Sequence, residues 1–143
     1  MSDLGLTHIA FAVRDLADSI AFYAKFASME VIHRRRDQES GGEVAWVTDR
    51  TRPFVIVLVQ SKTAKDTSLG PFGHLGIALP TREAVNKLAA AAREDGCLLS
   101  KPTDSGPPVG YWTFLSDPDG NTLELSYGQE IAFIVGQESA VEG

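Results

Sequence analysis

A short pattern that occurs twice constrains the fold of this chain more than any other feature of its sequence. The first copy runs from His8 to Val13 and the second from His74 to Leu79. Alternate residues of a strand share a face. Each histidine would therefore lie with two small residues on one face, whereas the other face is bulky and apolar. A face that packs in the core would not need a histidine and two small residues. The pattern therefore predicts a duplicated strand whose histidine lines a cavity.

The segment after the first copy has the signals of one helix and three strands. Asp15 is a good N-cap, and apolar residues recur at helical spacing up to Ala27. Gly41-Gly42 and the stretch from Asp49 to Pro53 indicate turns. The strands expected here are Met29 to Arg35, Glu43 to Thr48 and Phe54 to Gln60.

The second half repeats this order of elements. Thr81 can cap a helix with an apolar stripe, and Gly96 ends it. The strands that follow are expected at Leu98 to Lys101, Tyr111 to Leu115 and Thr122 to Tyr127. The sequence therefore predicts an α+β fold of two βαβββ modules, which can close around a cavity within one chain or between two.

Composition and charge exclude several classes of protein. The chain has 143 residues with a net charge of -6, which disfavours a nucleic-acid or anionic-membrane binder. The single cysteine, Cys97, favours a reducing compartment. No signal peptide or membrane-spanning run is recognisable. We expect a cytoplasmic protein that acts on a small molecule.

The last predicted strand carries one charged residue, Glu124. Thr122, Glu124 and Ser126 share one face, and this face can be interpreted as a solvated outer surface. Alternatively, the polar face points inward. Two imidazoles and one carboxylate would then converge, and this set suits a divalent metal with positions left for water and substrate.

Four segments resemble the vicinal oxygen chelate superfamily, which includes glyoxalase I, bleomycin and fosfomycin resistance proteins and extradiol dioxygenases. The segments are Leu6 to Leu16, Ser19 to Tyr23, Gly73 to Ile77 and Ser116 to Leu125. The resemblance implies a single domain with a curved, partly open β-barrel. Its parts would be module one at residues 4–61, a linker at 62–71, module two at 72–129 and a tail at 130–143.

The resemblance also implies a metal site and an assembly. The family's metal-binding positions correspond to His8, His74 and Glu124, and the ion would be Fe, Zn, Ni or Mn. Members commonly form homodimers, so the ligands can come from one chain or from two. The apolar segment from Ile131 to Val135 is then expected to pack on the barrel or on a partner chain.

This chain departs from two of the family's enzymes. Glyoxalase I has a fourth ligand in the last strand of its first module, where Ile56, Val57 and Leu58 are apolar here, unless Gln60 reaches in from a shifted register. Extradiol dioxygenases have a catalytic tyrosine at the position of Phe114, and a histidine that is absent here. A water molecule or a tyrosine in the cavity would have to replace the missing base.

Aromatic and basic residues add candidates for substrate binding. The candidates are Trp46, Tyr111, Trp112 and Phe114, although core packing also explains aromatic residues. The run from His33 to Arg36 is either a solvated strand end or a site that captures an anionic group.

Three functions follow from these features. The first is a glyoxalase-like metalloenzyme with lyase or isomerase chemistry. The alternatives are a non-haem Fe(II) dioxygenase of the extradiol type and a non-catalytic protein that binds a drug or metabolite, as bleomycin-resistance proteins do.

Overall fold

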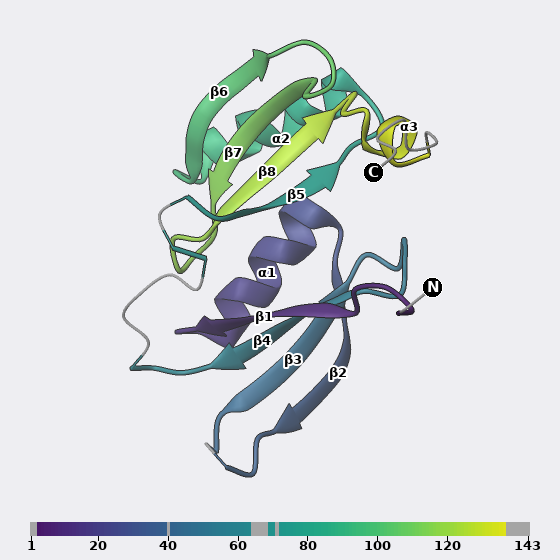
Figure 1. The fold of residues 1–143 in the computed structure, drawn as a ribbon. Coiled ribbons are helices and arrows are strands. Elements are labelled where there is room, and N and C mark those ends of the chain that lie inside the picture. The colour runs from purple at the N-terminus through teal and green to yellow at the C-terminus, as the bar shows by residue number, and fades with distance from the viewer. Residues whose placement is uncertain (1–2, 40, 64–68, 71, 137–143) are drawn as a thin grey trace. The chain divides into compact units, whose positions relative to one another are not determined.

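The computed structural model describes residues 3–39, 41–63, 69–70 and 72–136, and they form two compact units (Figure 1). The first unit contains the chain up to His74 together with Ser116–Thr122, and the second contains Leu75–Leu115 and the chain from Leu123 onward. Part of the expected linker, residues 64–68 and 71, and part of the expected tail, residues 137–143, lie outside the described residues.

The first unit is a mixed four-stranded sheet with a helix across one face. Its elements are β1 (His8–Val13), α1 (Leu16–Ala27), β2 (Glu30–Arg36), β3 (Glu43–Thr48) and β4 (Val55–Gln60). The strand order is β1-β4-β3-β2, with β1 parallel to β4 and the other pairs antiparallel. Because β1 and β2 are edge strands, this sheet does not close on itself.

Helix α1 begins and ends where the sequence predicts. The Asp15 side chain accepts a hydrogen bond from the Asp18 amide at 3.0 Å, as an N-cap does. The Oε1 atom of Gln60 accepts from the Leu16 amide at 2.9 Å and satisfies another N–H at the start of the helix. Ser28 ends the helix in the left-handed conformation, with φ 53°.

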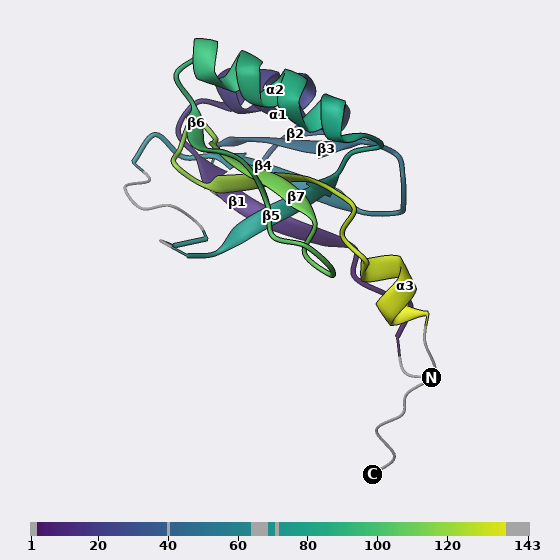
Figure 2. The same cartoon turned by 90° about the horizontal axis from the view of Figure 1, so that it is seen from above.

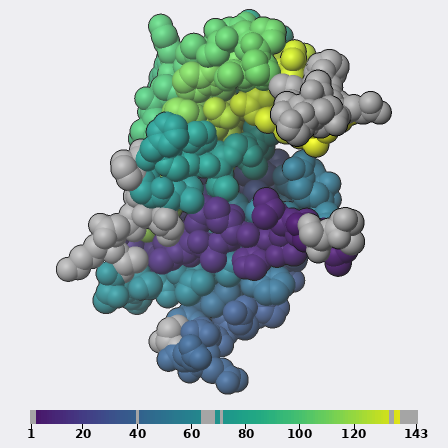
Figure 3. Space-filling model, in the orientation of Figure 1, coloured from purple at the N-terminus to yellow at the C-terminus, as the bar shows by residue number. Residues whose placement is uncertain are grey.

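Strand β1 has the two-faced character expected from the repeated pattern. Phe11 and Val13 are buried on the face of the sheet that contacts α1, whereas His8 is exposed on the opposite face, which we call the open face. Figure 3 shows β1, in purple, at the surface. The open face also carries Ala10 and Ala12 of β1 and Val55, Val57 and Val59 of β4.

The second unit is built on a second four-stranded sheet and a helix. Its elements are β5 (His74–Ala78), α2 (Arg82–Glu94), β6 (Leu98–Asp104), β7 (Tyr111–Ser116), β8 (Thr122–Tyr127) and α3 (Ile131–Val135). The strand order is β5-β8-β7-β6, so this sheet is also open. Thr81 caps α2, which lies along one face of the sheet (Figure 2). The two predicted βαβββ modules are confirmed.

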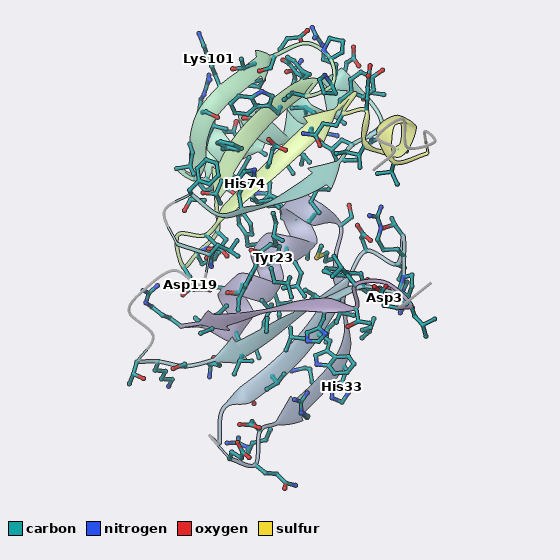
Figure 4. All side chains as sticks on the ribbon, viewed as in Figure 1. Asp3, Tyr23, His33, His74, Lys101 and Asp119 are labelled. Atoms are coloured by element: carbon teal, nitrogen blue, oxygen red, sulfur yellow. The ribbon has the colours of Figure 1, made fainter. Side chains whose placement is uncertain are left out.

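The turn between β7 and β8 belongs to the first unit. Asp117, Asp119 and Asn121 in this turn are 3%, 7% and 1% exposed. The hydroxyl of Tyr23 on α1 donates to Asp117 Oδ2 at 2.8 Å, and Asp119 Oδ1 accepts from the amide and the guanidinium of Arg14 at 2.9 and 3.0 Å (Figure 4). A buried polar network therefore fixes this turn against α1.

One strand extends beyond the sequence prediction, and the apolar tail forms a short helix. Strand β6 continues beyond Lys101 through Pro102 to Asp104, because an edge strand tolerates a residue without an N–H donor. The segment expected to pack as an apolar tail forms α3, in which Ile131 is 63% and Val135 is 77% exposed. The chain's own sheet therefore does not cover these two residues. No helix in the described part of the chain is long and apolar enough to span a membrane.

Candidate functional site

His8 begins β1 at an exposed position on the open face of the first sheet. Its Nδ1 atom lies 2.8 Å from the hydroxyl oxygen of Thr7. A hydroxyl can donate or accept, so this contact is compatible with both neutral tautomers of the ring. When Nδ1 donates, the lone pair lies on Nε2, as it does in many histidines that bind metals. The chemistry of His8 therefore fits a metal ligand.

His74 begins β5 (Figure 4), and its contact with a backbone carbonyl selects a tautomer. Its Nδ1 atom lies 3.1 Å from the backbone carbonyl oxygen of Phe72. A carbonyl oxygen only accepts, so the neutral ring carries its proton on Nδ1 and its lone pair on Nε2. The ring of Phe72 also meets the imidazole edge to face, with centroids 6.0 Å apart. Both contacts fix the orientation of a ring whose Nε2 is suited to metal binding.

Glu124 lies on β8, on the face opposite the fully buried Leu123 and Leu125. It is 9% exposed, so the interpretation of this face as a solvated outer surface is wrong. Its Oε2 atom accepts a hydrogen bond from Gln129 Nε2 at 2.9 Å. The same oxygen lies 3.5 Å from the point where Gly76 would carry a Cβ atom. The small residue on β5 therefore leaves room for the carboxylate.

The charge of Glu124 has no cationic partner within the ranges that the structure describes. Its hydrogen-bond donor, Gln129, is a neutral amide. Removing an ionised carboxylate from water is costly unless a cation or several hydrogen bonds compensate. A bound cation would supply this compensation.

The three predicted ligands are divided between the two units. His8 belongs to the first unit and Glu124 to the second. Among residues 3–39, 41–63, 69–70 and 72–136, no group of three His, Cys, Asp or Glu side chains is placed to hold a metal ion. The ligand set therefore stays a prediction, and the local chemistry of each residue is its support.

The described strands beside His8 provide no fourth ligand. The register pairs His8 with Val55 and places Val57 and Val59 on the same face. Gln60 pairs with Val13 on the opposite face, where its side chain binds the start of α1. The possibility that Gln60 reaches the site from a shifted register is therefore wrong.

Strand β7 carries aromatic candidates on both of its faces. The Tyr111 hydroxyl donates to Asn86 of α2, and the Arg82 guanidinium lies 4.1 Å from the centre of the Tyr111 ring. Tyr111 therefore faces the helix. Trp112 and Phe114 point to the other side of the sheet, with ring centroids 4.7 Å apart. This pair is the aromatic surface that β7 presents away from α2.

A hollow with a volume of about 180 Å³ lies beside Tyr111 in the second unit. Its lining includes Arg82 and Asp104, which form an ion pair, and none of the three predicted metal ligands. This volume is below the range of about 300–1,000 Å³ typical of ligand pockets. The hollow is therefore a poor substrate site.

Trp46, on β3, is the aromatic candidate of the first sheet. It pairs with Val57 and so lies on the open face with His8. Its Nε1 atom is buried and has no hydrogen-bond acceptor in the part of the chain that is described. In contrast, Nε1 of Trp112 donates to Ser105 Oγ at 2.8 Å. A buried donor without an acceptor costs about 1–3 kcal/mol, so a ligand oxygen at this point would be stabilising.

The positions of the three tyrosines argue against a tyrosine as the missing base. The hydroxyls of Tyr23 and Tyr111 donate hydrogen bonds to Asp117 and Asn86, respectively. Burial and the neighbouring Asp117 carboxylate also raise the pKa of Tyr23 far above its ordinary value. Tyr127 lies at the end of β8, and its side chain is on the face opposite that of Glu124. Water is then the remaining proton carrier of the two suggested by the sequence.

The sequence of this chain matches a known protein family. The family profile described as the Glyoxalase/Bleomycin resistance protein/Dioxygenase superfamily matches residues 5–125. An uncharacterized protein from Pseudomonas aeruginosa is 40% identical over 128 residues, which cover 88% of this chain and 90% of that protein.

Two further comparisons concern proteins with a stated activity or role. A putative lactoylglutathione lyase from Brassica oleracea is 30% identical over 124 residues, which cover 82% of this chain but 42% of that protein. This chain therefore spans less than half of that relative. A fosfomycin resistance protein from Listeria monocytogenes has a TM-score of 0.72 at 19% identity, with 89% of this chain and 95% of that chain covered. At this identity the match shows a shared fold.

Proposed function

Because the chain belongs to the glyoxalase/bleomycin resistance protein/dioxygenase superfamily, we propose that it is a glyoxalase-like metalloenzyme. His8, His74 and Glu124 hold a divalent ion in this proposal, and all three lie within the matched residues 5–125. The reaction is a lyase or isomerase step on a small molecule with two adjacent oxygen atoms. The similarity to a putative lactoylglutathione lyase supports this reaction class.

The observation that carries the proposal is the environment of Glu124. A carboxylate that is 9% exposed and bonded to one neutral amide is a suitable ligand for a cation. The ligand types also fit, since imidazole and carboxylate together suit Zn, Fe, Ni or Mn. The contact of His74 with the Phe72 carbonyl favours the tautomer that a metal ligand requires.

The chain's own residues would position the ligands. Gln129 holds one oxygen of Glu124, and Phe72 holds the ring of His74. Ala10 is a small, exposed residue on the histidine face of β1, and Gly76 on β5 leaves room for the Glu124 carboxylate. When bound, a divalent ion would polarise two substrate oxygens and stabilise developing negative charge on them.

Metal content and activity test the proposal together. We expect the purified protein to contain one divalent ion per site and to form lactoylglutathione from glutathione and methylglyoxal. His74→Ala should remove both properties, whereas His33→Ala, which changes a histidine on β2, should retain the metal. A protein without stoichiometric metal, whose ligand binding is the same in the His74→Ala variant, would contradict the proposal and favour the non-catalytic binding function.

The absence of a fourth ligand on the described strands β1 and β4 favours a second candidate. Valine occupies the three β4 positions on the face of His8, so two histidines and one carboxylate remain. This is the ligand set of non-haem Fe(II) oxygenases. Phe114, where these dioxygenases have a tyrosine, counts against this candidate. Oxygen consumption with Fe(II) and a panel of catechols tests it, and no consumption across the panel would exclude extradiol cleavage of those substrates.

We also propose a homodimer, in which the ligands come either from one chain or from two. Co-expression of a His8→Ala chain with a Glu124→Gln chain separates these arrangements. If His8 of one chain works with Glu124 of the other, the mixed dimer contains one intact site and regains metal. If all ligands come from one chain, every site in the mixed dimer stays defective.

A further inference from the structure

The basic run from His33 to Arg36 is divided between the two faces of β2. Arg34 pairs with Glu43 at 3.0 Å, and Arg36 donates to the carbonyl oxygen of Gly41 at 2.9 Å. These two arginines therefore have acceptors within the hairpin of β2 and β3. His33 and Arg35 lie on the other face, because His33 is the cross-strand partner of Trp46.

His33 and Arg35 both contact the ring of Trp46. The centroids of the imidazole and indole rings are 4.7 Å apart, and Cζ of Arg35 lies 6.0 Å from the indole centroid. No carboxylate pairs with Arg35 in the described stretches of the chain. The indole N–H is buried without an acceptor. Trp46 therefore has a buried N–H without an acceptor among the described residues, and two side chains that carry further N–H donors contact its ring.

We propose that Trp46, Arg35 and His33 form a subsite for an anionic oxygen group of a small organic ligand. The indole N–H donates to one oxygen, the guanidinium supplies charge-assisted hydrogen bonds, and the imidazole supplies a further donor. A carboxylate and a phosphate both provide this chemistry. Because the indole N–H of Trp46 is buried, a ligand with a hydrogen-bond acceptor at this point should bind better than an apolar one, which would leave the N–H without a partner.

The register indicates the size of a ligand that uses this subsite and the metal together. Trp46 is two strands and two residues away from His8, which corresponds to a Cα separation of about 12 Å at ordinary strand spacing. We therefore infer that the substrate carries its anionic group at the opposite end from its metal-binding oxygens. Only this statement on the substrate rests on the proposed function, since binding of an anion at Trp46 requires no metal.

The indole N–H resonance of Trp46 provides a direct test. Benzoate and inorganic phosphate are titrated separately into the full-length protein at constant ionic strength, which keeps general screening constant. The resonance is assigned by its loss in Trp46→Phe, a variant that retains an aromatic ring. We expect a saturable downfield shift, and the anion that binds more tightly distinguishes a carboxylate ligand from a phosphate ligand.

Neighbouring arginines supply a matched pair of variants. Arg35→Gln should weaken anion binding by about tenfold, the loss expected for one charge-assisted hydrogen bond, whereas Arg34→Gln should leave it unchanged. The inference is overturned if neither anion moves the resonance. It is also overturned if the two variants weaken binding equally, since both would then act only through net charge.

Repeating the titration with chelator and with His74→Ala separates this inference from the proposed function. Anion binding that persists without metal supports the subsite even if no metal site exists. If the untreated protein contains metal but neither anion shifts the Trp46 resonance, the subsite is overturned and the proposed function still stands.

Discussion

The two sheets share one plan but differ at matching positions. The third residue of β4 is Val57, and the third residue of β8 is Glu124. On the strands next to them, the indole N–H of Trp46 has no acceptor among the described residues, whereas that of Trp112 donates to Ser105. The two sheets therefore place side chains at matching positions, but the chemical character of those side chains differs. The second sheet holds a carboxylate suited to a cation, and the first sheet holds donors suited to an anion.

Removing the carboxylate of the second sheet is the largest expected effect. Glu124→Gln should lower metal affinity by more than about 100-fold, because it removes a ligand. Substitution of a residue that only hydrogen-bonds to a ligand already lowers metal affinity by about 10- to 100-fold. Calorimetric titration with the metal measures this loss. Glu130→Gln is the matched control, because it removes a nearby carboxylate whose residue contacts Pro108 through its backbone amide.

The reverse substitution sharpens the same comparison. Val57→Glu gives β4 a carboxylate at the position that Glu124 has in β8, and should tighten metal binding if the open face of the first sheet contributes to the site. Unchanged affinity in a folded Val57→Glu protein, together with unchanged affinity in Glu124→Gln, would contradict the assignment of the metal to these faces.

The two modules also differ in how a tyrosine holds their helices. Tyr23→Phe removes a buried hydrogen bond to the Asp117 carboxylate and should lower the free energy of unfolding by about 2 kcal/mol. Tyr111→Phe removes an exposed bond to a neutral amide and should cost less than about 1 kcal/mol. Urea denaturation of both variants measures the difference. Equal losses would show that the turn from Asp117 to Asn121 does not anchor α1 as described.

Gln129 is a positioning residue for Glu124 in this interpretation. Gln129→Ala should weaken metal binding by about tenfold, because the carboxylate loses the donor that orients it. Gln129→Leu, which keeps a side chain of similar size without a donor, should weaken binding to a similar extent. If the protein folds and both variants bind metal as the parent does, Gln129 has no part in the site.

The smallest expected effects concern the two tryptophans. Trp112→Phe removes a satisfied hydrogen bond and should cost about 1 kcal/mol beyond the loss of apolar area. Trp46→Phe removes a buried donor without an acceptor, so the corresponding cost should be absent. Thermal unfolding of the two variants compares them directly. A larger loss for Trp46→Phe would mean that its N–H is satisfied in solution.

The sequence predicts most of the frame because the frame depends on local signals. Alternating polarity defined β3 and β8 to the residue, and the caps at Asp15 and Thr81 located both long helices. The extension of β6 through Pro102 was missed, since only the position of a strand at a sheet edge makes proline acceptable there. Whether a strand lies at the edge of a sheet depends on the order of the strands, which a local sequence pattern does not show.

The candidate site was less predictable than the frame. Alternation placed His8 and Glu124 on defined faces, but it left the burial of Glu124 and the role of Gln60 open. The contact of Gln129 with Glu124 was missed because Gln129 lies beyond the strand, where periodicity no longer applies. The division of the basic run at His33 to Arg36 became clear only from the pairing of β2 with β3.

The position of the turn from Ser116 to Thr122 in the first unit has a consequence for synthesis of the chain. All strands of the first sheet have been synthesised once Gln60 is added, yet the acceptor for the Tyr23 hydroxyl is Asp117. A contact between residues so far apart in sequence forms late, because the loop between them must first close. The amino-terminal module is therefore completed only after most of its partner module has been translated, and a nascent chain that stops before Ser116 leaves α1 without its polar anchor.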